Sequence, residues 1–184
     1  MKLITELTED VEYITEKSED GKKSTFIKGR FITCEEGNAN GRVYRKGLIE
    51  GEVNRYIKEI VSSKRAFGEL NHPQGPTINL DRVSHIITEL NWDGNYVNGK
   101  AKLTSTPMGE IARGLIESGG QLGVSTRGMG SLVERNGLME VQKDFRLATV
   151  DIVSDPSGPG CFVNGIMEGV DWIYDPVKGT LHEE

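Results

Sequence analysis

The chain has 184 residues, a net charge of −6 at neutral pH and 36% hydrophobic residues. This length suits a single domain with a substantial core. No apolar run is long enough to cross a membrane, the acid-rich N-terminus does not resemble a signal peptide, and the negative charge disfavours nucleic acid as a ligand. The histidines are scattered without zinc spacing, so we expect no metal. We expect Cys34 and Cys161 to be reduced thiols.

The first half of the chain predicts one strand and one helix. Residues 1–23 are polar and acidic, and we expect them to be partly mobile. An alternating pattern predicts a strand over residues 24–33, and a Gly- and Asn-rich loop follows over residues 35–47. Apolar residues then recur at helical spacing, which predicts a helix over residues 48–64.

The second half predicts a strand-rich unit. Residues 83–92 and 96–103 read as a hairpin, and Thr106 caps a helix that ends before Gly119. Four further strands are expected, at residues 121–127, 130–135, 138–143 and 145–153. Because strands cluster instead of alternating with helices, the pattern favours an α+β fold with a mostly antiparallel, barrel-like sheet.

Three short segments hold residue types suited to nucleophilic catalysis. They contain His72, Ser125 and Asp151, in Gly68–Pro73, Gly123–Gly128 and Val150–Val153. A serine hydroxyl needs an imidazole to accept its proton, and the imidazole needs an orienting group. The carboxylate of Asp151 lies in an apolar strand pattern, where burial is costly without a partner. No local motif spans these separations, so only folding can bring the three side chains together.

Each assignment has an alternative within the sequence. His85 is a second candidate base, although its alternating context is more typical of a structural histidine in a strand. Asp155 is an alternative to Asp151, although the simpler interpretation of Asp155 is that it forms part of a turn. Ser125 sits between an expected strand and a glycine-bearing turn, and a tight turn with a capping serine would give the same pattern. Backbone N–H groups near Arg127 and Gly128 are candidate oxyanion donors.

At these residues the sequence resembles the prohead core proteases of T-even-like tailed phages. The resemblance extends over residues 31–163 and is most specific in four segments, which are Asn40–Tyr44, Gly68–Pro73, Gly123–Leu132 and Val150–Val153. It implies His72 as general base, Ser125 as nucleophile and Asp151 as the third member. Thr126 departs from the pattern, in which we expect a second serine. The chain also ends without the long C-terminal extension that we expect.

The resemblance implies a serine endopeptidase that cleaves scaffold and capsid proteins inside the procapsid, in the host cytoplasm, without a cofactor. It implies distant similarity to the herpesvirus capsid assembly proteases, with a β-barrel flanked by helices. Nucleic acid and membrane are not expected partners, and a homo-oligomer is compatible with the sequence. We expect a protease domain over residues 24–180 and an exposed end at residues 181–184. A non-catalytic capsid component of the same fold and a small-molecule serine hydrolase are the alternatives.

The resemblance also implies cleavage after glutamate in Leu/Ile-x-Glu. Such triplets occur near both ends of this chain, so we expect self-cleavage at Glu6, Glu9, Glu16 or Glu183. A basic side chain is needed to receive the substrate glutamate, and the candidates are Arg127 and Arg82.

Overall fold

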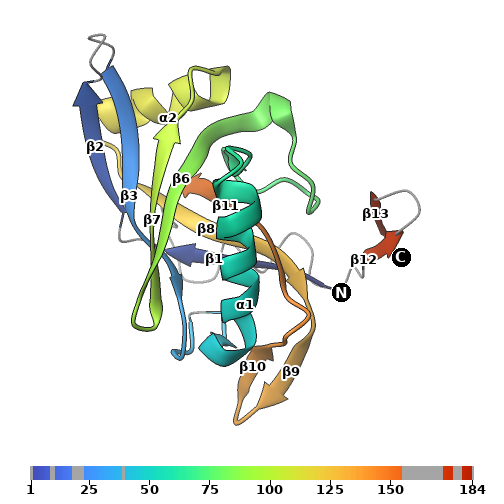
Figure 1. Ribbon diagram of the computed structural model, residues 1–184. Helices are drawn as coiled ribbons and strands as arrows, with labels where there is room; N and C mark the ends of the chain where they lie inside the picture. The colour runs from blue at the N-terminus through green and yellow to red at the C-terminus, as the bar shows by residue number, and fades with distance from the viewer. Residues whose placement is uncertain are drawn as a thin grey trace.

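The computed structural model describes residues 2–8, 11–17, 23–38, 40–154, 172–175 and 180–183 (Figure 1). Its largest sheet has the strand order β2 (Val11–Lys17), β3 (Lys23–Thr33), β7 (Tyr96–Leu103), β6 (Val83–Asp93) and β5 (Phe67–Glu69). A second sheet has the order β1 (Lys2–Thr8), β8 (Leu122–Gly130) and β11 (Arg146–Ser154). All neighbours within these two sheets are antiparallel.

Two smaller sheets complete the described strands. One has the order β4 (Arg42–Tyr44), β10 (Leu138–Val141) and β9 (Leu132–Arg135), and the other pairs β12 (Trp172–Asp175) with β13 (Thr180–Glu183). The helices are α1 (Lys46–Tyr56), its π-helical continuation η1 (Ile57–Val61), the short 3-10 turn η2 (Leu80–Arg82) and α2 (Pro107–Glu117). The described part of the chain holds no helix that is long and apolar enough to cross a membrane.

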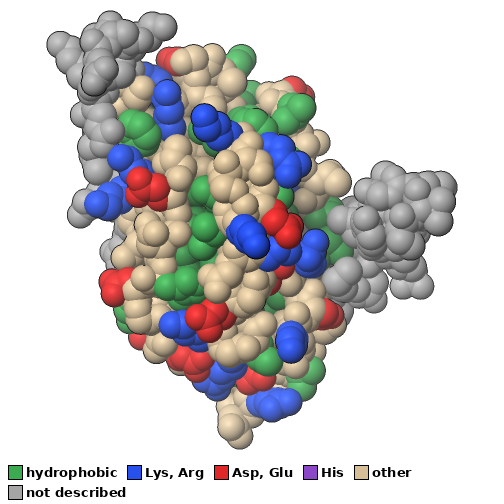
Figure 2. All heavy atoms as spheres, in the orientation of Figure 1, with side chains coloured by type: hydrophobic (Ala, Val, Ile, Leu, Met, Phe, Trp, Pro, Cys, Tyr) green, Lys and Arg blue, Asp and Glu red, His purple; other side chains and the backbone are tan. Residues whose placement is uncertain are grey.

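One hydrophobic core joins the two large sheets and α1. The five-stranded sheet contributes Ile27, Phe31 and Ala101, and the three-stranded sheet contributes Val124 and Ile152, all of them at most 1% exposed. The helix α1 packs its buried face, formed by Ile49, Val53 and Tyr56, over this core. In Figure 1 the helix lies across the sheets. Acidic and basic side chains intermingle on the face seen in Figure 2.

Several local predictions are confirmed. The strands β3, β6 and β7 match their expected ranges to within a residue. The Oγ1 atom of Thr106 accepts a hydrogen bond from the backbone of Gly109 at 3.2 Å and so caps α2, as expected. The turn between β9 and β10 has positive φ at both Asn136 and Gly137, which is the turn geometry that this dipeptide favours.

The N-terminal expectation needs correction. We expected residues 1–23 to be a separate, partly mobile segment, whereas β1 pairs with β8 and β2 pairs with β3. Backbone pairing and the fully buried side chain of Ile4 integrate residues 2–8 and 11–17 into the sheets. The acid-rich sequence did not indicate either strand. Strands can form there all the same, because backbone hydrogen bonds need no apolar side chains.

Other differences concern short or merged strands. The three-residue strands β4 and β5 were not expected, because three residues are too few to show a period. The helix expected over residues 48–64 begins earlier, at Lys46, and its regular part ends at Tyr56. The strand β8 runs unbroken to Gly130, where we expected a turn after residue 127. The described strands form separate sheets and do not close into the expected barrel. The mixed α+β class itself is confirmed.

Candidate active site

Ser125 and Asp151 lie side by side because their strands pair. They are direct partners in the antiparallel ladder between β8 and β11. Directly opposite residues in such a ladder project from the same face, with their Cβ atoms about 4.5–5.5 Å apart. A third side chain placed over this face can therefore contact both. The sequence separation of the two residues is spanned by β9, β10 and their turns.

His72 reaches this face from the loop that follows β5. Leu70 forms a parallel bridge with Ile152, and the backbone N–H of Asn71 donates to the Ile152 carbonyl at 2.7 Å. Asn71 has a φ of 64°, in the left-handed region that asparagine tolerates better than most residues. The chain turns here, and Pro73 restricts the backbone of His72 from the other side.

The three side chains form a continuous hydrogen-bonded chain. The Nδ1 atom of His72 lies 2.8 Å from Oδ2 of Asp151, and its Nε2 atom lies 2.8 Å from Oγ of Ser125. The carboxylate can only accept, so Nδ1 carries the proton and Nε2 is free to accept one from the serine hydroxyl. This arrangement of nucleophile, base and orienting carboxylate is the one that acyl transfer requires.

The site is closed to solvent in this structure. Ser125 and Asp151 are 0% exposed, and the side chain of His72 is 5% exposed. Burial alone would raise the pKa of Asp151, but the hydrogen bond with His72 and the neighbouring Arg127 guanidinium outweigh it and hold the pKa below its usual 3.8. Asp151 is therefore ionised at neutral pH. A peptide has to open the site before it can reach the hydroxyl.

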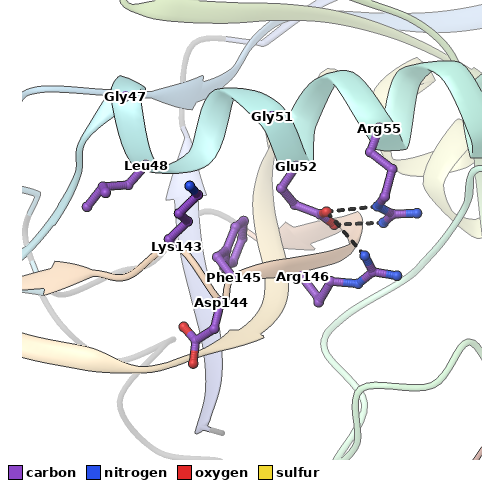
Figure 3. Close-up of a pocket in the computed structure, with 9 residues that line it drawn as sticks. All are labelled: Gly47, Leu48, Gly51, Glu52, Arg55, Lys143, Asp144, Phe145 and Arg146. Carbon is purple, nitrogen blue, oxygen red and sulfur yellow. Dashed lines mark hydrogen bonds and ion pairs between the residues drawn. The ribbon is translucent and has the colours of Figure 1, made fainter. Parts of the chain in front are cut away.

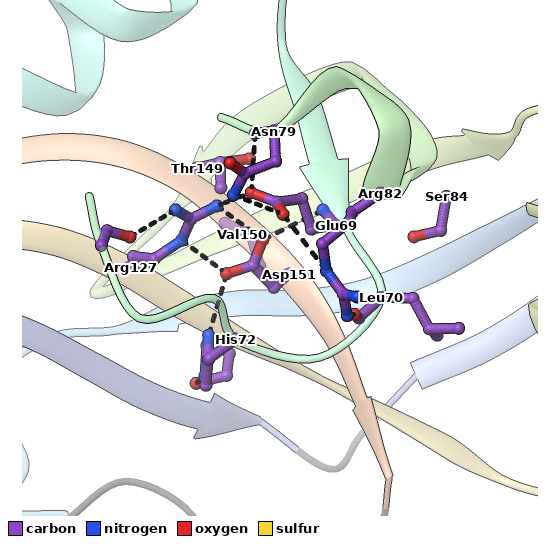
Figure 4. Close-up of polar contacts among 12 residues, drawn as sticks. Glu69, Leu70, His72, Asn79, Arg82, Ser84, Arg127, Thr149, Val150 and Asp151 are labelled. Atoms are coloured by element: carbon purple, nitrogen blue, oxygen red, sulfur yellow. Dashed lines mark hydrogen bonds and ion pairs between the residues drawn. The ribbon is translucent and has the colours of Figure 1, made fainter. Parts of the chain in front are cut away.

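Arg127 lies behind the triad and has no exposed surface. Its Nε atom is 2.8 Å from Oδ2 of Asp151, and its Nη2 atom is 3.1 Å from Oδ1 of Asp151 and 2.8 Å from Oε2 of Glu69 (Figure 4). Its Nη1 atom donates to the carbonyls of Gly75 and Thr77, both at 2.9 Å. All five guanidinium protons thus have acceptors within the protein.

These contacts correct one of our expectations. With every donor taken and no exposure, the Arg127 side chain is not available to receive a substrate glutamate. Gly128 has a packing role, because a Cβ atom there would lie 2.5 Å from the ring of Phe145. The backbones of both residues belong to a strand that is flanked by β1 and β11, and such ladders take up N–H groups. The structure therefore gives no support to these two residues as oxyanion donors.

Known proteins resemble this chain over most of its length. The model of the family described as prohead core protein serine protease matches residues 5–170. The chain belongs to this family. The prohead core protein protease of Enterobacteria phage T4 is 37% identical over 156 residues, which are 80% of this chain and 74% of the relative. The solved structure of the bacteriophage T4 capsid assembly protease has a TM-score of 0.70 at 32% identity, over 83% of this chain and 99% of that one.

Membership confirms the resemblance that the motifs indicated. The fold of this chain is similar to that of the T4 capsid assembly protease. The family match begins at residue 5, so it includes most of β1 and all of β2. The similarity to herpesvirus proteases stays a prediction.

The rival base, His85, lies elsewhere in the structure. It is 0% exposed, with Nε2 2.7 Å from the carbonyl of Val150 and Nδ1 2.8 Å from Oγ of Ser84. Gly68 makes room for the ring, because a Cβ atom there would lie 2.1 Å from Nε2. His85 thus supports β11 next to Asp151 and does not contact Ser125 through any of these bonds. The other rival, Asp155, lies outside the described residues.

His85 gives a prediction for stability against pH. Burial lowers its pKa below 6.5, and the smaller opposing effect of the Val150 carbonyl does not restore it. Below pH 6.5 the unfolded chain takes up a proton there that the folded protein does not, so stability falls as the pH drops, by at most about 1.4 kcal/mol per pH unit. Urea unfolding at pH 7.5 and 5.5 measures this loss. The effect should shrink in His85→Gln, and an equal loss in that variant would contradict the assignment. Asp151 contributes to the pH dependence of stability only at lower pH, near and below 3.8.

A separate groove lies between α1 and the segment that joins β10 to β11 (Figure 3). Its volume is about 400 Å³, and no triad residue lines it. Glu52 neutralises part of the positive charge that lines the groove, because its carboxylate lies 2.7 Å from the guanidinium of Arg55 and 3.7 Å from that of Arg146. This groove is therefore not part of the catalytic arrangement. Among the described residues no cluster of His, Cys, Asp or Glu is placed to hold a metal ion.

The sequence missed two residues of the site. Glu69 was not among the predicted site residues, and Arg127 was assigned to substrate and oxyanion binding. Both are charged residues that lie within three positions of a triad member. A charge that has to be buried needs an opposite partner, which is the signal that could have linked them. Glu69 also receives the backbone N–H of Asn79 at 3.2 Å and its Nδ2 at 3.1 Å.

Proposed function

We propose that this chain is a serine endopeptidase that cleaves scaffold and capsid proteins inside the procapsid during phage head maturation. The observation that supports it most is the His72 imidazole, placed 2.8 Å from both Ser125 and Asp151, in a chain of the prohead protease family. The host cytoplasm, within the procapsid, is the proposed location. Scaffold and major capsid proteins are the proposed partners.

The proposed mechanism is acyl transfer in two steps. His72 Nε2 takes the proton of Ser125 as Oγ attacks the scissile carbonyl, and the same proton then passes to the leaving amine. Water, activated by His72, releases the acyl group and restores the serine. Asp151 holds the Nδ1 proton and stabilises the imidazolium without accepting that proton. Its lowered pKa keeps it ionised for this role.

The proposed cleavage preference is for glutamate in Leu/Ile-x-Glu. Of the two arginines expected to receive the glutamate, only Arg82 stays available. Its side chain is 40% exposed, it donates from Nη2 to the Leu70 carbonyl at 2.8 Å, and its Nε atom is 3.7 Å from Glu69. It belongs to η2, at the end of the loop that begins with His72. Charge reversal, Arg82→Glu, should weaken cleavage after glutamate far more than cleavage after glutamine.

Self-processing at the chain ends follows as a prediction of its own. Glu6, Glu16 and Glu183 lie in the paired strands β1, β2 and β13, and Glu9 lies outside the described residues. Proteases need an extended, accessible backbone, so these strands have to detach before cleavage. We expect slow cleavage at these sites in the wild type, read from terminal peptides by mass spectrometry, and none in Ser125→Ala. Cleavage confined to lysine or arginine, or the same peptides from both proteins, would contradict the prediction.

The proposed function is tested with a candidate scaffold protein as substrate. Wild type and Ser125→Ala are incubated with it under identical conditions, and the products are read by intact-mass spectrometry. We expect discrete fragments that end in glutamate from the wild type only. An intact scaffold with both proteins would favour the non-catalytic capsid component. Turnover of small esters without any peptide cleavage would favour the small-molecule hydrolase.

A further inference from the structure

Asp151 forms an ion pair with Arg127 in addition to its hydrogen bond with His72. Arg127 contacts both of its oxygens, at 2.8 and 3.1 Å, in the bidentate geometry that makes arginine–carboxylate pairs strong. The backbone N–H of Glu69 adds a third donor at 3.0 Å. Together with His72, these donors fix the carboxylate completely. They also pose an electrostatic problem for the proposed mechanism.

The problem is one of charge. A carboxylate neutralised by a guanidinium attracts an imidazolium weakly, and the imidazolium forms in the transition state. In a buried pair of Arg127 and Asp151 alone, the net charge facing His72 would be zero. Low-dielectric surroundings make such a cancellation matter more than it would in water.

Glu69 changes the balance. Its Oε2 atom lies 2.8 Å from Nη2 of Arg127, and its side chain is 0% exposed, like those of Arg127 and Asp151. The buried trio of Glu69, Arg127 and Asp151 therefore has a net charge of −1. When His72 gains its proton, the four side chains together become neutral (Figure 4 shows Arg127 in contact with both carboxylates).

We propose that Glu69 is a positioning residue of the active site, which acts through Arg127 to keep the charge of Asp151 effective on His72. This inference rests on the proposed function. Arg127 in turn makes the burial of two carboxylates tolerable, and through Gly75 and Thr77 it anchors the loop that follows His72. The two residues thus act together. Arg127 holds Asp151 and the loop in place, and Glu69 restores the net negative charge that Arg127 would otherwise cancel.

The charged and titratable groups around His72 come from five elements. Asp151 on β11 contacts it directly, and Arg127 on β8 and Glu69 on β5 stand behind Asp151. Arg82 on η2 faces Glu69 at 3.7 Å from the partly exposed side. His85 on β6 is buried and neutral, since its lowered pKa prevents protonation. Glu69 is therefore the only group among these, apart from Asp151, that adds negative charge.

The test is Glu69→Gln, which keeps the size and hydrogen-bonding capacity of the side chain and removes its charge. In the Ser125→Ala background, NMR follows the imidazole of His72 through its titration. We expect the midpoint in Glu69→Gln to move to lower pH by about one unit, because a nearby negative charge is lost. In the active protein we expect kcat to fall about tenfold with KM unchanged.

Glu140→Gln is the matched control. Glu140 is also a mostly buried glutamate that is paired with an arginine, at 3.3 Å from Arg45, but it lies on β10 away from the triad. We expect this control to leave the midpoint and kcat unchanged. A Glu69→Gln protein that folds and has the wild-type midpoint would overturn the inference, since a purely structural glutamate would behave in that way.

Two further results keep the test decisive. If Glu69→Gln does not fold, Arg82→Gln removes the cation that faces Glu69 from a 40% exposed side chain. The midpoint should then move to higher pH, and an unchanged midpoint would overturn the inference. The NMR titration needs no substrate, so its outcome is separate from that of the scaffold digestion. A shifted His72 midpoint in a protein that cleaves no peptide would reject the proposed function, but it would still support the electrostatic role of Glu69.

Discussion

Replacing Ser125 or His72 by alanine is expected to remove nearly all proteolysis, by a factor of about 10⁶ in kcat. The Ser125 hydroxyl cannot attack unless His72 accepts its proton, and His72 cannot promote catalysis if the hydroxyl is absent. The double variant should therefore be hardly worse than either single one. Cleavage of a scaffold substrate measures the rates, and circular dichroism with thermal unfolding checks that the fold is retained.

Ser84→Ala provides the control for this prediction. Ser84 is also a buried serine, with Oγ 2.8 Å from a histidine nitrogen, but its partner is His85. We expect this variant to keep its activity, because His85 bonds to the Val150 carbonyl and not to a nucleophile. Loss of activity in Ser84→Ala with normal cleavage by His72→Ala would transfer the role of base to His85.

Replacing Arg127 by methionine is expected to give the largest loss of stability. The change leaves the carboxylates of Glu69 and Asp151 buried without their shared cation, and breaking a buried ion pair costs about 3–5 kcal/mol. In a chain of this size that loss lowers the unfolding temperature by roughly 10 °C. Thermal and urea unfolding measure the two quantities.

Two comparisons make this result specific. Arg146→Met removes an arginine whose side chain is 62% exposed and 3.7 Å from its glutamate, so it should change the free energy of unfolding by only about 0.5 kcal/mol. Adding Glu69→Gln to Arg127→Met should recover part of the stability, because one of the two unpaired charges disappears. Equal stabilities for Arg127→Met and Arg146→Met would contradict the buried charge network.

Local patterns predicted the parts of the fold that depend on local physics. The β6–β7 hairpin, the Thr106 cap of α2 and the Asn136–Gly137 turn all follow from residues close in sequence. The strands β4 and β5 did not, since three residues show no period. The strand β1 was not predicted because its partner β8 lies far along the chain, and β2, which pairs with the adjacent β3, was not predicted because its sequence is rich in charged residues.

The site divides in the same way. Residue chemistry and the resemblance pointed to His72, Ser125 and Asp151, and the structure brings these three together. The strand expected over residues 121–127 includes Ser125, and the serine does lie inside β8, but its ladder partner Asp151 could be identified only from the fold. Arg127 was misassigned because an arginine is usually exposed, and only the fold puts two carboxylates beside it.

The catalytic arrangement is tested most directly with a fluorophosphonate, which forms a covalent bond only with an activated serine. Buried sites open transiently, so prolonged incubation with excess reagent allows even this closed site to react. Intact-mass spectrometry and peptide mapping should show one adduct, on Ser125, in the wild type and in Ser84→Ala. They should show none in Ser125→Ala and strongly slowed labelling in His72→Ala. An unlabelled wild type, or an adduct on another residue that persists in Ser125→Ala, would contradict the account.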